Sequence, residues 1–162
     1  MNLGHEYFLD LQLFENSSYR FSPYYLDNFP RTNFKCESWL QYVRLPELQC
    51  DFEVTEVPHK TLGDAILIFD SLRKKGVTHI LKVIVPDCTI HPHGDDAVIR
   101  CLEGLHVKKL DWRKQDLSVA TILQAAPEVE EVRLYSSGNR DVLSHWASYE
   151  GLYRLPKVSP HP

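Results

Sequence analysis

A six-residue pattern, apolar-x-x-apolar-x-apolar, recurs along the C-terminal two thirds of the chain. It occupies residues 80–85, 107–112 and 129–134, and a fourth copy begins at residues 155–158. The first residues of successive copies are 27, 22 and 26 positions apart. Because a repeat at such spacing makes each copy one structural unit that packs on the next, this pattern constrains the fold more than any single motif.

The spacing falls within the roughly 20 to 29 residues of leucine-rich repeats, in which this pattern forms a short parallel strand with its apolar residues turned inward. Parallel strands need a crossover connection between them, usually a helix. The sequence therefore predicts an α/β fold. We expect a short leucine-rich-repeat-like solenoid with a parallel sheet on one side, helices on the other and an N-terminal cap region.

Segments with helix start and end signals lie between the expected strands. Residues 61–75 place apolar side chains at helical spacing, and Gly76 follows as an end signal. Three shorter helices are expected to open at Asp95, Ser118 and Asn139. Helices this short are not stable alone in water, so each must dock its apolar side on the sheet.

The first sixty residues lack this regularity. Residues 7–13 alternate apolar and polar side chains, as strands do, whereas residues 17–34 are typical of an irregular loop. Residues 45–50 fit the repeat pattern once, 35 positions before the next copy. We expect residues 1–60 to form a cap and a divergent first repeat, and residues 61–162 to form the βα repeats of a single compact domain. A separate α+β element is the alternative for the N-terminal part.

Composition and charge argue against several functional classes. The net charge of -4 gives no basic footprint for binding nucleic acid. No stretch approaches the ~18 consecutive apolar residues of a membrane span, and the N-terminus has no secretion-signal pattern. We therefore expect a cytoplasmic protein that binds neither nucleic acid nor a membrane.

The cysteines are far apart and form no CxxC pair: Cys36, Cys50, Cys88 and Cys101. A chain of this length can build a core without disulfides, so reduced and mostly buried thiols are expected. The segment 86–96 does gather a thiol, two imidazoles and three carboxylates. A metal-binding protein is therefore an alternative, with the candidate ligands Cys88, His91, His93 and Asp95. Their loose spacing matches no known zinc motif and is explained as well by an ordinary polar loop.

No catalytic or phosphate-binding motif is present in the sequence. There is no G-x-S-x-G, GxxxxGK or GxGxxG pattern. The segment Ser136–Asn139 is the nearest to a nucleophile elbow, but its composition is typical of a turn. His145, beside Trp146, is expected to be a packing or surface residue. We therefore expect no catalytic residues and no cofactor.

Residues between the buried apolar positions should line the concave face of the sheet, where equivalent positions of successive repeats are lateral neighbours. One expected ladder is Lys82, Lys109, Glu131 and Lys157; a second is Ile84, Asp111 and Arg133; a third is Pro86, Arg113 and Tyr135. Arg and Tyr are enriched where proteins bind one another. We therefore expect a non-catalytic protein–protein interaction or scaffolding module, with a solvated face and no partner as the alternative. The predicted partner-binding residues are Lys82, Lys109, Asp111, Arg113, Arg133 and Tyr135.

Four segments, 81–87, 104–118, 125–146 and 151–158, carry the distinctive words LDW, AAPEVE, LYSSGN and VLSHW. They resemble a leucine-rich-repeat-like αβ region of filamentous-fungal multidomain proteins that also carry a subtilisin-like serine protease domain. The resemblance implies a non-catalytic part of an intracellular fungal protein, a regulatory or pro-region of a subtilisin-like hydrolase. None of the segments that carry a subtilisin triad is found here, so no catalytic residue is transferred.

The expected fourth strand, residues 155–158, runs directly into Ser-Pro-His-Pro. Either the prolines protect this edge of the sheet or a longer protein continues beyond it. An unprotected edge strand can pair with a second copy of the chain. Weak self-association through the C-terminal edge strand is therefore expected.

Overall fold

The computed structural model describes residues 8–11, 38–45, 60–89 and 91–158. Within them the chain forms one parallel sheet and four α-helices, followed by a short 3-10 helix. The strands are β1 (Phe8–Asp10), β2 (Trp39–Arg44), β3 (His79–Val85), β4 (Lys109–Gln115) and β5 (Glu131–Tyr135). The helices are α2 (Lys60–Lys74), α3 (Asp95–Leu102), α4 (Val119–Ala125), α5 (Arg140–Trp146) and η3 (Leu152–Arg154). The predicted α/β class is confirmed.

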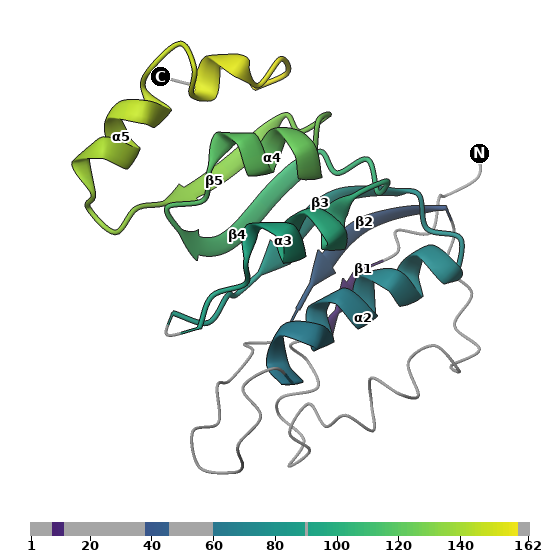
Figure 1. Cartoon of the computed structure of the whole chain (residues 1–162). Helices are drawn as coiled ribbons and strands as arrows, with labels where there is room; N and C mark the ends of the chain where they lie inside the picture. Colours follow the sequence, from purple (N-terminus) through teal and green to yellow (C-terminus); the bar gives the residue numbers. More distant parts are fainter. Residues whose placement is uncertain (1–7, 12–37, 46–59, 90, 159–162) are drawn as a thin grey trace.

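The strands lie in the sheet in chain order, β1-β2-β3-β4-β5, and each is parallel to its neighbour. Helices α2, α3 and α4 cover one face of this sheet (Figure 1), and α3 packs between the other two. Trp146 of α5 extends the same layer, because its buried Nε1 donates a hydrogen bond of 3.2 Å to the carbonyl of Leu117. No described helix therefore lies on the opposite face of the sheet.

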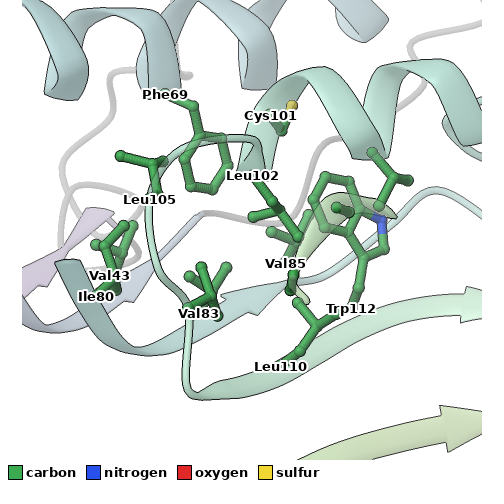
Figure 2. Close-up of a cluster of buried hydrophobic side chains, with 14 of the residues drawn as sticks. Val43, Phe69, Ile80, Val83, Val85, Cys101, Leu102, Leu105, Leu110 and Trp112 are labelled. Carbon is green, nitrogen blue, oxygen red and sulfur yellow. The ribbon is translucent and has the colours of Figure 1, made fainter. Parts of the chain in front are cut away.

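The hydrophobic core lies between the sheet and the helices. Val43, Val83 and Leu110 are lateral neighbours in the sheet and are all buried. Phe69 from α2 and Leu102 from α3 complete the cluster from the helical side (Figure 2). Because side chains alternate between the two faces of a strand, the residues between these apolar positions face away from the helices.

Several helix boundaries follow the sequence signals. The side chains of Ser118 and Asn139 cap α4 and α5 by accepting backbone N–H bonds of 3.0 Å and 2.9 Å, as expected. Gly76 ends α2 with φ +90°, a left-handed conformation that favours glycine. At α3 the prediction is wrong by one residue, because Gly94 is the cap and Asp95 is the first helical residue. The carboxylate of Asp95 is instead bound by side chains from β4 and α4.

The structure shows a copy of the repeat pattern that begins five residues before the copy expected at 45–50. A strand within residues 7–13 is confirmed, but β2 was not predicted. It carries the repeat pattern as Leu40, Val43 and Leu45, which are all buried, and Leu40 and Val43 pair with Ile80 and Val83 of β3. Of the expected copy at 45–50, only residue 45 lies within the described residues. The predicted boundary at residue 60 stays a prediction.

The expected strand at residues 155–158 is wrong. These residues follow η3 in a turn, in which the backbone N–H of Val158 bonds back to the carbonyl of Leu155 at 3.4 Å. Pro156 has no N–H to donate to a sheet, so the segment lacks a donor that a strand would need. The C-terminal edge strand of the described sheet is therefore β5, and weak self-association through a C-terminal edge strand stays a prediction. Among the described residues, no helix is long and apolar enough to cross a membrane.

Candidate functional site

The sheet face opposite the helices, named here the outer sheet face, carries most of the polar side chains predicted to bind a partner. Lys82, Lys109 and Glu131 form one row across β3, β4 and β5. Ile84, Asp111 and Arg133 form the next row. The pairing within these two predicted ladders is confirmed, except that Lys157 is absent from the first because its segment is not a strand.

The third predicted ladder is wrong. Tyr135 pairs with Gln115 rather than with Arg113, because β4 is irregular between Asp111 and Gln115. A bulge of this kind changes the register and redirects side chains. As a result the Tyr135 hydroxyl reaches back to Asp111 and donates a hydrogen bond of 2.7 Å to its Oδ1.

Asp111 is a buried carboxylate at the centre of the outer sheet face. Its side chain is only 3% exposed, whereas the side chains of Arg113 and Arg133 are 42% and 61% exposed. Arg113 Nε lies 3.8 Å from Asp111 Oδ1, and Arg133 Nη1 lies 3.7 Å from Oδ2, both beyond hydrogen-bond distance. The pKa of Tyr135 is raised by its burial and by the hydrogen bond to Asp111, which favours the neutral phenol. The carboxylate thus holds a tyrosine and orients two guanidinium groups.

Lys109 and Glu131 form an ion pair of 2.8 Å in the neighbouring row. The hydrogen bond from Lys109 and its charge lower the pKa of Glu131. Because both side chains are nearly half exposed, the pair contributes little to stability. It places a charged pair beside the group formed by Asp111, Arg113, Arg133 and Tyr135, named here the Asp111 centre.

Sequence reasoning missed Arg44, which pairs with Ile84 and therefore lies in the row of Asp111 and Arg133 on the outer sheet face. Its Nε is buried and has no hydrogen-bond partner among the described residues. The residue was missed because β2 was not recognised as a repeat. Reading Leu40-x-x-Val43-x-Leu45 as a copy of the pattern would have found it.

A second polar centre lies where the carboxyl ends of β3 and β4 meet. The carboxylate of Asp87 is fully buried and accepts hydrogen bonds from the backbone N–H of Cys88 at 2.8 Å and from Trp112 Nε1 at 2.8 Å. Its Oδ1 also lies 2.7 Å from Nδ1 of His93, which is itself buried. Burial alone would raise the pKa of Asp87, but the contacts with His93 and Trp112 lower it overall. Asp87 therefore fastens the loop after β3 onto β4.

The four candidate metal ligands do not come together. His93 contacts Asp87, while Asp95 accepts hydrogen bonds from Lys114 and, at 2.7 Å, from Thr121. His91 lies in an exposed turn, and its backbone N–H bonds to Cys88 Sγ at 3.4 Å. No group of three or more His, Cys, Asp or Glu side chains among the described residues could hold a metal ion. The structure therefore gives the metal-binding alternative no support.

The expectation of reduced thiols is wrong for Cys88, which is disulfide-bonded. Cys101 is free, and burial raises the pKa of its thiol to about 12. Disulfide pairing depends on which cysteines the fold brings together, so the spacing in the sequence does not reveal it.

The segment Ser136–Asn139 forms the expected turn. Ser137 donates its backbone N–H at 2.9 Å and its hydroxyl at 2.5 Å to the carboxylate of Asp116. Gly138 adopts φ +88°, which a left-handed turn position requires. Because both serines are exposed and Ser137 is held by a carboxylate, the geometry is that of a turn before α5.

Comparison with models of protein families, with curated proteins and with solved structures finds no match. The resemblance to the fungal protease-associated region therefore stays a prediction, as does the non-catalytic character of the chain. We infer function from the geometry of the described residues alone.

Proposed function

We propose that the chain is a leucine-rich-repeat-like solenoid that binds a protein partner through its outer sheet face. The solenoid is supported by the strand order and by helices that cover only one face among the described residues. It is also supported by side-chain bonds from each unit to the next. Trp112 reaches Asp87, and Tyr135 reaches Asp111, across separations of 25 and 24 residues.

The observation that carries the proposal is the group formed by Arg113, Arg133 and Tyr135 around the buried Asp111. Arginine and tyrosine are the residue types most often found at the energetic centres of protein interfaces. Here one carboxylate accepts a hydrogen bond from the tyrosine, which therefore loses less conformational freedom on binding than an unrestrained side chain would, and attracts both guanidinium groups. The outer sheet face thus offers a preorganised contact surface.

The proposal is tested by comparing the proteins captured by three forms of the full chain from a lysate of its native cells. The forms are the wild type, the face variant Arg113→Ala/Arg133→Ala and the control Arg140→Ala/Arg154→Ala. Arg140 and Arg154 are also exposed, but they lie in α5 and η3. Partners retained by the wild type and the control but lost by the face variant, with unchanged circular dichroism, support the proposal. Identical capture by all three forms contradicts it.

A further inference from the structure

The charge of the outer sheet face is opposite in sign to that of the whole chain. Register places four cations and three carboxylates of the described strands on this face, and Arg113 joins them because it lies beside Asp111; the chain as a whole carries -4. The cations are Arg44, Lys82, Lys109, Arg113 and Arg133, and the carboxylates are Asp10, Asp111 and Glu131. A surface with an excess of one charge attracts and orients partners of the other charge.

The Asp111 centre carries an excess of one positive charge. One carboxylate lies between two guanidinium groups, at 3.8 Å from Arg113 and 3.7 Å from Arg133, and so balances only one of them. The distances leave both guanidinium groups without a hydrogen bond to Asp111. A guanidinium group can bind a carboxylate through two parallel N–H bonds, and these two groups are exposed enough to do so.

A third guanidinium group lies in the same row across the sheet. Arg44 pairs with Ile84 of β3 on one side and with Asp10 of β1 on the other, so a carboxylate lies beside it in the row. The buried Arg44 Nε has no hydrogen-bond partner among the described residues, and a buried donor without an acceptor is unfavourable. The excess positive charge of the face therefore lies at Arg113, Arg133, Lys82 and Lys109 rather than at Arg44.

We infer that the partner presents an acidic protein segment whose carboxylates bind between Arg113 and Arg133 and extend toward Lys82 and Lys109. This inference rests on the proposed function. Separate carboxylates suit a face on which cations and anions alternate. A continuous phosphate backbone would meet Glu131 and a chain of net negative charge, so nucleic acid is disfavoured.

The probe for this inference is a fluorescein-labelled ten-residue peptide of alternating Glu and Gly, measured by fluorescence anisotropy with the full chain. Peptides with Lys or Gln in place of Glu are the matched probes. We expect the Glu peptide to bind, and Arg113→Gln/Arg133→Gln to weaken binding by about tenfold. The control Arg140→Gln/Arg154→Gln should change the affinity by less than about twofold. Added salt should weaken binding of the Glu peptide both to the wild type and to this control.

Equal binding of the Gln or Lys peptide would overturn the inference, and so would a labelled DNA duplex that binds the same face more tightly than the Glu peptide. Failure of the Glu peptide, with capture from native cells still dependent on Arg113 and Arg133, would refute the acidic partner and leave the proposed function intact. Capture that does not depend on these residues would refute both proposals.

Discussion

Two buried aspartates connect neighbouring units of the sheet through their side chains. Asp87 binds Trp112 of β4, and Asp111 binds Tyr135 of β5, with donor–acceptor distances of 2.8 Å and 2.7 Å. A buried carboxylate is stable only when hydrogen bonds or opposite charges compensate for its lost hydration. These residues are therefore sensitive positions for both stability and recognition.

Replacing Asp87 with Asn should lower the free energy of unfolding by about 2 to 3 kcal/mol, because one acceptor oxygen becomes an amide that faces the donors of Trp112 and the loop. Urea unfolding measures the change. The control is Asp96→Asn, an exposed carboxylate of α3, for which we expect less than about 0.5 kcal/mol. Equal losses in the two variants would show that the Asp87 bonds contribute nothing specific.

Replacing Tyr135 with Phe should cost about 1 to 2 kcal/mol, because the buried Asp111 loses its tyrosine hydroxyl. Thermal or urea unfolding measures this loss against Tyr149→Phe, whose side chain is exposed and should be neutral. A Tyr135 variant is thus a poor test of binding, since it also alters stability. An unchanged unfolding midpoint for Tyr135→Phe would contradict the bond.

Glu128 should make stability depend on pH in acid. Hydrogen bonds from His106 and Lys108, with the nearby charge of Lys157, lower its pKa from 4.5 to about 2. Because the folded-state pKa is the lower one, its stabilising effect is complete above pH 4.5 and is lost as the pH falls toward 2. Unfolding free energies of the wild type and Glu128→Gln should therefore differ at pH 6 and converge near pH 2. A difference independent of pH would exclude this ionic contribution.

At the scale of elements, the repeat pattern predicted the sheet and its core. Ile80, Val83 and Val85 are all buried where the pattern placed them. It missed the copy in β2, which the pairing of Leu40 with Ile80 reveals; of the copy expected at 45–50, only residue 45 lies within the described residues. It failed again at Leu155, which is buried in the core although its segment is not a strand. Burial alone therefore does not distinguish a strand from a turn that packs on the core.

The candidate site was predictable as a set of residues but not as a geometry. Alternation along each strand is sufficient to place Lys109 and Asp111 on one face. The irregularity in β4 and the burial of Asp111 depend on how β4 meets β5, so the bond from Tyr135 could not be read from the sequence. The role of Asp87 was also hidden, because its donors come from the following loop and from the next strand.

Gly151 joins α5 to η3, and a side chain there should disrupt this connection. A Cβ atom would lie 2.6 Å from the carbonyl oxygen of Trp146 and closer still to that of His145. Gly151→Ala should therefore cost about 2 to 3 kcal/mol of unfolding free energy. Gly94→Ala is the control, because its Cβ would meet nothing within 4 Å, and its cost should stay below about 1 kcal/mol. Similar losses would contradict the tight turn.

At the scale of the whole molecule, helices cover one face of the sheet and leave the other without a described helix (Figure 1). Each unit bonds mainly to its neighbours, as the Asp87 and Asp111 contacts illustrate. Such stacking keeps equivalent side chains in rows, so that charges from β2 to β5 act on one surface. As a result, the outer sheet face carries an excess of positive charge although the whole chain carries a net negative charge.

Recognition through the outer sheet face is tested most directly by site-specific photo-crosslinking in native cells. A photoreactive amino acid replaces Glu131, a half-exposed residue of the outer sheet face, or, as the matched position, Tyr149 just after α5, which is 86% exposed. We predict that position 131 cross-links to a defined protein, at a segment rich in Asp and Glu, and that position 149 does not. The same products from both positions, or products from position 149 alone, would contradict recognition through this face.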